Sequence, residues 1–331
     1  MRNRSTETSA FSLTLFVFGV IFVPMYSASA QTSAGREPVF GKDRSDSTFF
    51  VVNSPSAASE GTDSILTFDA RGDGTVFFSA KHNLVGLRDI ACDPKNPQHI
   101  FVSHNSFPAT AGLLIFDASG HRDTIPSGTP GGPVSLAFDR AGDLYTAMLQ
   151  ADRPAGTIFK NDTVLANLPF TGIGQIAVDR NGNVYLTDPA VSSRIFHIDQ
   201  AGNVTVFADA SKGLIAPYGL AIDSRNNLFV ANNPGSSPAF ILKFDPSGTV
   251  TSFATNISFQ PSIRSMTFDD GDNLYATLEA DNTILKFDRR GNSSVFATAS
   301  NGLNNPIAVT VGTCPVDGKD REDERHFSKE P

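Results

Sequence analysis

Five segments of this chain repeat one pattern, and that repetition limits the possible folds more than any other feature. Each copy has an apolar run ending in Ala-x-Asp or Thr-x-Asp, a polar turn and a second apolar run. The copies read RDIACDPKNPQHIFVSH, VSLAFDRAGDLYTAM, GQIAVDRNGNVYLTD, YGLAIDSRNNLFVAN and RSMTFDDGDNLYATL. Their shared Asp residues are Asp93, Asp139, Asp179, Asp223 and Asp269, separated by 46, 40, 44 and 46 residues. A period of this length, built from short strands and turns, predicts a β-propeller.

Each repeat divides into four short strands. The first precedes the shared Asp and the second follows it, while the third ends in a recurring Asp-x-x-Gly turn, as in Asp245–Gly248. The Asp side chain caps such a turn, and Gly supplies the positive φ that closes a short hairpin. One repeat differs, because a tight Asn161-Asp162 connection replaces the four-residue turn.

The two ends of the repeat region complement each other. The N-terminal repeat begins with STFFVVN and lacks a first strand, whereas the C-terminus supplies an unaccompanied first strand, PIAVTVG. Pairing the two gives an all-β, six-bladed propeller with four-stranded blades over residues 48–314. Such closure also removes a free sheet edge that would invite aggregation.

The segments outside the repeats are expected to lie outside the fold. A basic start, an apolar run over Phe11–Pro24 and Ala28-Ser29-Ala30 predict a cleaved signal peptide over residues 1–30. A membrane anchor is the alternative, but the run is shorter than the roughly 20 residues that span a bilayer. Residues 31–47 are expected to form a loose lead-in, and the charged tail at 315–331 is expected to be disordered. The predicted location is therefore secreted or periplasmic.

Charge and cysteine content limit the possible partners and cross-links. The net charge of −8 argues against general binding to nucleic acid or anionic membranes. Export would permit a disulfide between the only two cysteines, Cys92 and Cys314, which would latch the closing blade. Disulfide geometry is strict, so the alternative of two unpaired cysteines stays open.

The repeat PYGLAIDSRNNLFVANNPGSSPAFILKFDPSG (Pro217–Gly248) resembles the NHL repeat, and the copies beginning at Gly174 and Arg264 match its form nearly as well. The resemblance covers about residues 47–312 and implies a six-bladed propeller superfamily. That superfamily includes gluconolactonase- and regucalcin-like metal-dependent lactone hydrolases, and related repeats occur in virginiamycin-B-lyase-like propellers. The resemblance is specific for the fold and weak for any one activity.

The resemblance also places a functional site at the axial opening, five residues before each shared Asp. Lactonase relatives carry metal-binding Asp and Asn side chains at this position. Here the six positions hold Arg88, Val134, Gly174, Tyr218, Arg264 and Ile307. Because a hard cation needs several oxygen ligands, this set predicts no metal site, and no cofactor is expected. A calcium or other divalent site built from other loops is the alternative.

The same ring suggests an anion-accepting pocket. Arg88 and Arg264 belong to the blades that flank the closing blade, and two guanidinium groups at one opening favour a carboxylate or acidic sugar. Asp89, Gln175 and Tyr218 are expected to line the same opening. The alternative is that Arg88 pairs with Asp89 or loop acids and that Arg264 pairs with Glu279.

Polar residues at the ends of the second strands are the remaining candidates. These are Asn53, His104, Asn105, Asp188, Asn232, Asn233 and Glu279. Asp188 and Asn232 occupy the Asp/Asn position of the NHL form, which caps a loop, and solvated loop polarity is their default interpretation. Asp188, Asn232 and Glu279 are kept as candidate ligand-binding residues.

These observations predict a monomeric binding module that recognises a small anion, a glycan or a protein. No catalytic set is recognisable in the sequence. A lactonase- or lyase-like enzyme with a relocated site is the second hypothesis, and an interaction propeller without a small ligand is the third.

Overall fold

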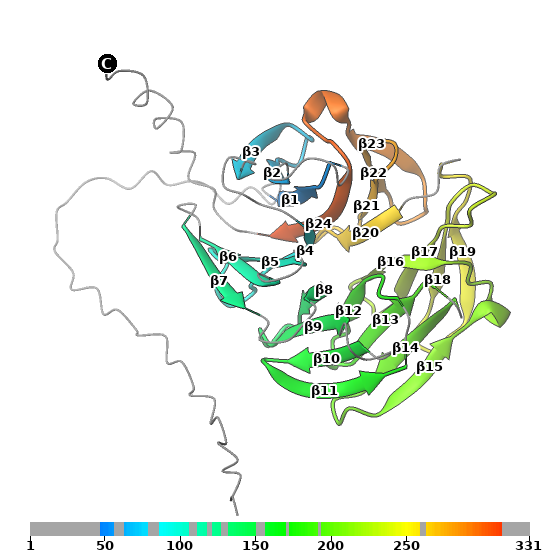
Figure 1. Cartoon of the computed structure of the whole chain (residues 1–331). Coiled ribbons are helices and arrows are strands. Elements are labelled where there is room, and N and C mark those ends of the chain that lie inside the picture. Colours follow the sequence, from blue (N-terminus) through cyan, green and yellow to red (C-terminus); the bar gives the residue numbers. More distant parts are fainter. Residues whose placement is uncertain are drawn as a thin grey trace, which may run out of the picture. The chain divides into compact units, whose positions relative to one another are not determined.

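The computed structural model contains six four-stranded antiparallel sheets arranged around a common axis (Figure 1). It describes residues 47–55, 63–78, 86–105, 111–117, 121–126, 132–149, 156–169, 172–190, 193–258 and 263–312. The predicted all-β, six-bladed propeller is therefore confirmed. In each blade the first strand lies nearest the axis and the fourth lies outermost.

The first three blades are formed as follows. Blade 1 consists of β24 (Pro306–Gly312), β1 (Thr48–Asn53), β2 (Ser64–Phe68) and β3 (Gly74–Phe78). Blade 2 consists of β4 (Leu87–Cys92), β5 (Ile100–His104), β6 (Gly112–Phe116) and β7 (Arg122–Pro126). Blade 3 consists of β8 (Pro133–Phe138), β9 (Leu144–Leu149), β10 (Gly156–Lys160) and β11 (Thr163–Leu168).

The last three blades follow the same order. Blade 4 consists of β12 (Ile176–Val178), β13 (Val184–Asp188), β14 (Arg194–Ile198) and β15 (Val204–Ala208). Blade 5 consists of β16 (Pro217–Ile222), β17 (Leu228–Asn232), β18 (Phe240–Phe244) and β19 (Val250–Ala254). Blade 6 consists of β20 (Ile263–Phe268), β21 (Leu274–Leu278), β22 (Thr283–Phe287) and β23 (Ser293–Ala297). Short 3-10 helices occupy Ala210–Lys212 and Ala299–Asn301.

Blade 1 combines the two ends of the repeat region. The C-terminal strand β24 pairs antiparallel with β1, with Val309 opposite Val51 and Val311 opposite Phe49. Aromatic side chains then join this blade to both neighbours. The Phe49 ring centroid lies 4.4 Å from that of Tyr275 in blade 6, and the Phe78 centroid lies 4.6 Å from that of Phe116 in blade 2. Such buried aromatic pairs contribute about 0.5–1.5 kcal/mol each beyond the area they bury.

The turns have the chemistry that the repeats predict. In the turn after β12, Asp179 Oδ1 accepts the N–H groups of Asn181 and Asn183 at 2.8 and 2.9 Å. In the turn after β18, the Gly248 N–H donates to the Asp245 carbonyl at 2.9 Å, and Gly248 has a φ of +82°. A side-chain acceptor at the first position and Gly in the left-handed region together fix a short turn.

Two faces of the propeller follow from this arrangement. The turn face carries the turns between first and second strands, which contain the shared Asp residues, together with the turns between third and fourth strands. The loop face is the opposite one, where the first strands begin and the second strands end. Both names are used below.

Several sequence-based expectations fall outside the described residues. These are the signal peptide at 1–30, nearly all of the lead-in at 31–47, the tail at 315–331 and Cys314 of the candidate disulfide. Cys92 lies at the end of β4 and is half-buried. No helix among the described residues is long and apolar enough to cross a membrane.

Candidate functional site at the axial opening

The loop-face end of the channel is a narrow cavity lined by the first strands. It offers about 30 Å³ to the centres of water molecules, which is room for one or two of them. Its lining consists of Arg88, Asp89, Val134, Gly174, Gln175, Tyr218, Arg264, Ser265 and Ile307. All six residues predicted at the fifth position before the shared Asp therefore surround this one opening.

β-bulges at the start of the first strands place these side chains. The pairing register of β4 with β5 shifts between Leu87 and Asp89, which leaves Arg88 outside the ladder. The same shift leaves Val134 unpaired in β8, and Arg264 lies within a shift in β20. A bulge bends its strand and redirects a side chain, so the local backbone explains why these residues reach the opening.

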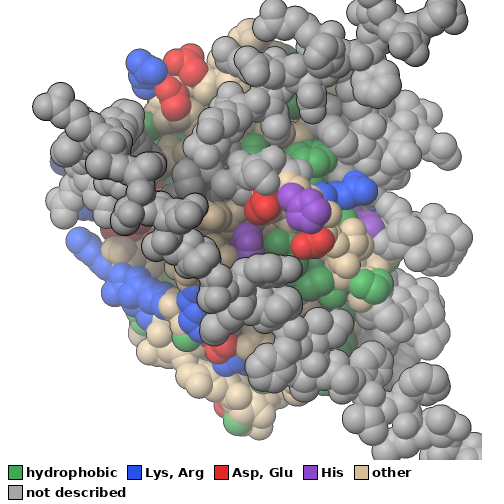
Figure 2. All heavy atoms as spheres, turned by 90° about the vertical axis from the view of Figure 1, so that its left-hand side faces the viewer, with side chains coloured by type: hydrophobic (Ala, Val, Ile, Leu, Met, Phe, Trp, Pro, Cys, Tyr) green, Lys and Arg blue, Asp and Glu red, His purple; other side chains and the backbone are tan. Residues whose placement is uncertain are grey.

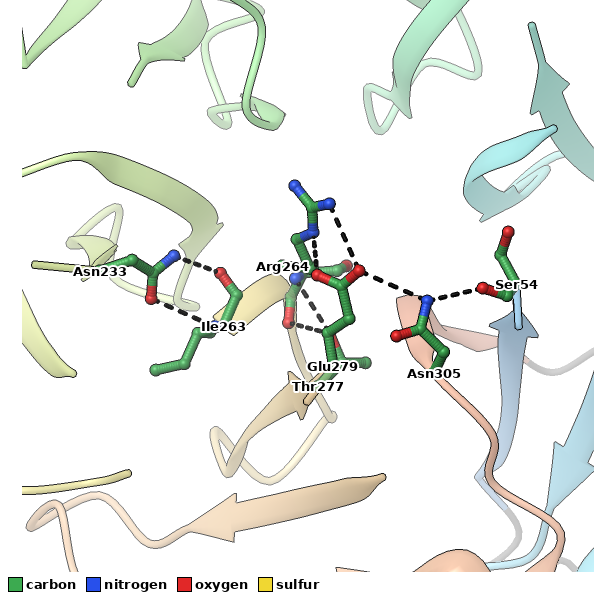
Figure 3. Close-up of polar contacts among 8 residues, drawn as sticks. Ser54, Asn233, Ile263, Arg264, Thr277, Glu279 and Asn305 are labelled. Atoms are coloured by element: carbon green, nitrogen blue, oxygen red, sulfur yellow. Dashed lines mark hydrogen bonds and ion pairs between the residues drawn. The ribbon is translucent and has the colours of Figure 1, made fainter. Parts of the chain in front are cut away.

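Arg264 is already neutralised. Its guanidinium group forms an ion pair with Glu279 through Nε and a second contact from Nη2 to Glu279 Oε1 at 3.4 Å. The guanidinium carbon also lies 4.7 Å from the centroid of the Tyr218 ring. Asn305 Nδ2 approaches Glu279 Oε1 at 3.4 Å and donates to the Ser54 carbonyl at 2.6 Å (Figure 3). The pairing of Arg264 with Glu279 left open by the sequence is thus observed.

Arg88 differs from Arg264 in exposure and in partners. Its side chain is exposed, and its guanidinium group forms no hydrogen bond or ion pair with another described residue. The buried Asp63 lies near enough to sense its charge and accepts the Leu87 N–H at 2.9 Å. Burial raises the pKa of Asp63, while the Leu87 N–H and, to a smaller extent, the Arg88 charge oppose that rise. Of the alternatives left open by the sequence, the pairing of Arg88 with Asp89 is not observed, since Asp89 accepts from Ser135, Leu136 and Ile90.

Asp89 connects neighbouring blades beneath the opening. Its Oδ2 accepts the Ser135 hydroxyl at 2.5 Å and the Leu136 N–H at 3.1 Å, and its Oδ1 accepts the Ile90 N–H at 2.9 Å. The Ser135 hydroxyl oxygen in turn accepts the Ile176 N–H of the next blade at 3.0 Å. Burial raises the pKa of Asp89 to about 6, and these three donors oppose the rise. The side chain thus satisfies backbone N–H groups that would otherwise be unpaired.

Gln175 continues this ring on the opposite side. Its Oε1 accepts the N–H groups of Leu220 at 2.9 Å and Met266 at 3.0 Å, and its Nε2 donates to the Ser265 hydroxyl at 3.1 Å. The Ser265 hydroxyl oxygen accepts the Val309 N–H at 3.2 Å. One side chain serves two blades here because Gly219, at the corresponding position of blade 5, has no acceptor to offer.

The ring of Asp89, Ser135, Gln175 and Ser265 was only partly anticipated. Asp89 and Gln175 were predicted as lining residues, but Ser135 and Ser265 were missed. All four stand four residues before a shared Asp, so aligning that column of the repeats would have shown a run of polar residues. We name these four residues the axial polar ring. Its hydrogen bonds give Asp89 and Gln175 a structural role.

Asp188 and Asn232 do not reach the opening. Both are fully buried at the ends of β13 and β17, so their interpretation as solvated loop residues is wrong. Asn232 Oδ1 caps the preceding loop by accepting the Ile215 N–H at 2.7 Å. Asp188 Oδ2 accepts from Arg194 Nε at 3.2 Å. The two buried side chains differ in how their oxygens are satisfied, because Asp188 Oδ1 has no hydrogen-bond partner among the described residues. Glu279 contributes to the opening only through Arg264.

The residues at the opening do not suit a hard divalent cation. Such an ion needs six to eight oxygen ligands, often carboxylates. The opening instead presents two guanidinium groups, and its one lining carboxylate, that of Asp89, already accepts three hydrogen bonds. Among the described residues no group of three or more His, Cys, Asp or Glu side chains could hold a metal ion.

The comparisons with known proteins support the architecture. No family model and no curated protein matches the sequence. The propeller of a nidogen/laminin complex matches with 18% identity over 81% of this chain and 99% of that chain, at a TM-score of 0.63. TolB from Acinetobacter baumannii matches with 15% identity over 80% of this chain and 66% of that chain, at a TM-score of 0.61.

A third similar structure is a putative 6-phosphogluconolactonase from Bacteroides fragilis. It matches with 12% identity over 83% of this chain and 99% of that chain, at a TM-score of 0.53. At these identities the likeness shows the fold alone. The chain therefore has the architecture of the propeller superfamily that its repeats indicated.

Proposed function

We propose that this chain is an exported binding module whose loop face docks a protein partner and holds one partner carboxylate at Arg88. The observation that carries the proposal is an exposed Arg88, which pairs with no other described residue, beside a cavity of only about 30 Å³. A carboxylate group fits such a space, whereas the molecule that bears it must lie outside, over the loop face. A single anchor in a small pocket within a larger contact area is typical of protein interfaces.

The charges around the opening favour one negative group there. Arg264 is compensated by Glu279, and the charge of Asp89 is partly compensated by its three donors. Arg88 therefore supplies the available guanidinium group among the residues that line the cavity. A planar guanidinium group binds a carboxylate by donating two parallel N–H···O bonds, which fix the orientation of the carboxylate as well as attract it.

Two further observations support a protein partner. A chain with a similar fold belongs to the crystal structure of a nidogen/laminin complex. The N-terminal pattern of a basic start, an apolar run and Ala28-Ser29-Ala30 supports export. Nothing at the opening favours the lactone-hydrolase alternative, since its donors do not suit the metal which that chemistry uses.

An NMR titration of the mature chain tests this proposal with the amide of N-acetyl-glutamate as the probe. Its single side-chain carboxylate should cause saturable shifts at Arg88 and Tyr218, whereas the neutral N-acetyl-glutamine amide should cause none. Arg88→Ala should abolish these shifts. Arg290→Ala, which removes the same charge from an exposed turn, should leave them unchanged. Equal binding of the neutral probe, or undiminished binding by Arg88→Ala, would refute the proposal.

A further inference from the structure

The channel opens more widely on the turn face than on the loop face. This second opening, which we call the turn-face funnel, offers about 340 Å³ to the centres of water molecules. Asp89 and Gln175 of the axial polar ring line both cavities, so these two side chains form the floor of the funnel. Its walls are the far halves of the first strands, and Pro94, Asp139 and Arg140 stand at its rim.

Small side chains keep the funnel open. Its lining includes Ala91, Ala137, Ala177, Ala221, Thr267 and Thr310, which all stand two residues before the shared Asp or its equivalent. On the same measure, its volume of about 340 Å³ is roughly eleven times that of the loop-face cavity, about 30 Å³. A ligand with one six-membered ring fits this space, whereas the loop-face cavity does not admit one.

The funnel walls present backbone polar groups as well as apolar side chains. Each first strand is the edge of its sheet nearest the axis. The backbone N–H and C=O groups on its channel side therefore have no neighbouring strand to pair with. The Leu136 N–H points across the channel edge to Asp89, and groups two residues further along a strand point the same way. Phe138 in β8 and Val178 in β12 therefore turn N–H and C=O groups towards the funnel. Covering these groups with a purely apolar molecule would be unfavourable.

Basic side chains stand in the turns between first and second strands of four consecutive blades, on the same face as the funnel. They are Lys95 in blade 2, Arg140 in blade 3, Arg180 in blade 4 and Arg225 in blade 5. All four are exposed, and none forms an ion pair with another described residue. Figure 2 shows Lys and Arg side chains gathered along one edge of the described surface, with acidic side chains among them.

Unlike these basic side chains, the acidic groups named below form hydrogen bonds or ion pairs or belong to blade 6. The shared Asp residues lie beneath the basic ones and accept turn N–H groups, as Asp179 does from Asn181 and Asn183. Asp270 and Asp272 belong to blade 6, where Asp272 is held by Ser224 and Arg289. Arg140 is the one basic residue that also lines the funnel.

We infer that the turn-face funnel binds a small hydroxylated carboxylate, with its carboxylate at Arg140 and its hydroxyl groups towards the floor. The cation at the rim and the Asp89 carboxylate at the floor together set this orientation, because an anionic group next to Asp89 would be repelled. Hydroxyl groups can satisfy the exposed N–H and C=O groups of the walls and can donate to Asp89. This site is independent of the proposed role of Arg88.

Isothermal titration of the full mature chain with three related probes tests the inference. D-glucuronate carries both a carboxylate and hydroxyl groups, D-glucose lacks the carboxylate, and cyclohexanecarboxylate lacks the hydroxyl groups. D-glucuronate should bind at least tenfold more tightly than either of the others. Equal binding of cyclohexanecarboxylate, or no binding of D-glucuronate, would overturn the assignment.

Three variants locate the binding. Arg140→Ala should weaken D-glucuronate binding at the funnel at least tenfold, whereas Arg88→Ala should remove only carboxylate binding at the loop-face opening and keep the funnel binding. Arg290→Ala serves as the matched control because it removes an exposed arginine that does not line the funnel. Binding that is lost in Arg88→Ala and kept in Arg140→Ala would place the ligand on the loop face and overturn the funnel site. Failure of the funnel therefore leaves the proposed function separately testable.

Discussion

The Ser135 hydroxyl donates a 2.5 Å hydrogen bond to Asp89 Oδ2, and this bond joins two neighbouring blades at the channel. The same hydroxyl oxygen accepts the Ile176 N–H at 3.0 Å, so one small side chain connects blades 2, 3 and 4. Equivalent contacts by Gln175 and Ser265 continue around the channel. These bonds satisfy backbone groups at six inner sheet edges, which an isolated blade cannot do for itself.

Ser135→Ala should therefore destabilise the fold. The substitution leaves the buried Ile176 N–H without its acceptor and removes one donor from Asp89. A buried group left unsatisfied costs about 1–3 kcal/mol, so the free energy of unfolding should fall by about that amount. Urea unfolding provides the measurement. Ser294→Ala on the exposed part of β23 is the control and should change stability little; equal effects of the two variants would contradict the prediction.

The stability of the propeller should depend on the protonation of Asp89. Burial raises its pKa to about 6, whereas an unfolded Asp titrates near 4. The folded state therefore binds the proton more tightly, and this stabilisation is fully present below about pH 4 and lost as the pH rises through about 6. The difference of about two pKa units corresponds to about 3 kcal/mol.

Asp89→Asn isolates that contribution, since Asn does not titrate. The stability advantage of the wild type over the variant should grow by up to about 3 kcal/mol when the pH is lowered from about 7 to about 4. Urea unfolding of both proteins at several pH values measures it. A stability difference that stays constant over this range would show that Asp89 has an ordinary pKa.

Gln175 should be harder to replace than Ser135. Gln175→Ala removes the acceptor of two backbone N–H groups, those of Leu220 and Met266, in two different blades. The expected loss is about 2–4 kcal/mol. Gln175→Glu keeps an acceptor oxygen but loses the Nε2 donations to the Ser265 hydroxyl and the Met266 carbonyl, so with its carboxyl neutral at low pH it should lose less stability than Gln175→Ala. The same loss in both variants would argue that packing, not hydrogen bonding, explains the role of Gln175.

Two turn glycines with the same backbone conformation should respond differently to substitution. Gly291 and Gly248 have φ values of +86° and +82°. A Cβ on Gly291 would lie 2.1 Å from the Phe253 carbonyl oxygen, whereas a Cβ on Gly248 would have its nearest neighbour at 4.0 Å. Gly248→Ala should cost only the backbone strain of about 1 kcal/mol. Gly291→Ala should cost clearly more, and thermal unfolding that shifts equally in both would contradict the clash.

Glu279→Gln should strengthen carboxylate binding at the loop-face opening. The substitution removes the charge that compensates Arg264 and leaves a second guanidinium group available beside Arg88. We expect about tenfold tighter binding of the N-acetyl-glutamate amide, which is about 1.4 kcal/mol. The NMR titration described above measures this change. Unchanged affinity would mean that the Tyr218 ring, which packs against the Arg264 guanidinium group, keeps the ligand from reaching it.

The spacing of the repeats predicted which residues surround the axial opening, but not how their side chains pair. Counting five residues back from each shared Asp placed Arg88, Tyr218 and Arg264 around one opening, because every first strand reaches its turn at the same depth in its blade. The same counting predicted two available arginines. The structure leaves one, because Glu279 reaches Arg264 from the end of the second strand. Tyr218 and Asn305, which lie far from this pair in sequence, contact Arg264 and Glu279 respectively.

The sequence by itself determined the six blades, their four-stranded order and the turn positions of Asp and Gly. The strand order and the turn positions follow from apolar alternation and turn chemistry within about 40 residues, so they can be recognised in one repeat, whereas the number of blades follows from counting the repeats and joining the two ends. Only the tertiary structure decided that Asp89 and Gln175 join blades, that Asp188 and Asn232 are buried, and that the wider opening lies on the turn face. Those outcomes depend on which polar atoms meet in the folded chain. Backbone N–H groups at the channel, such as those of Leu136 and Ile176, bond to acceptors that a neighbouring blade supplies.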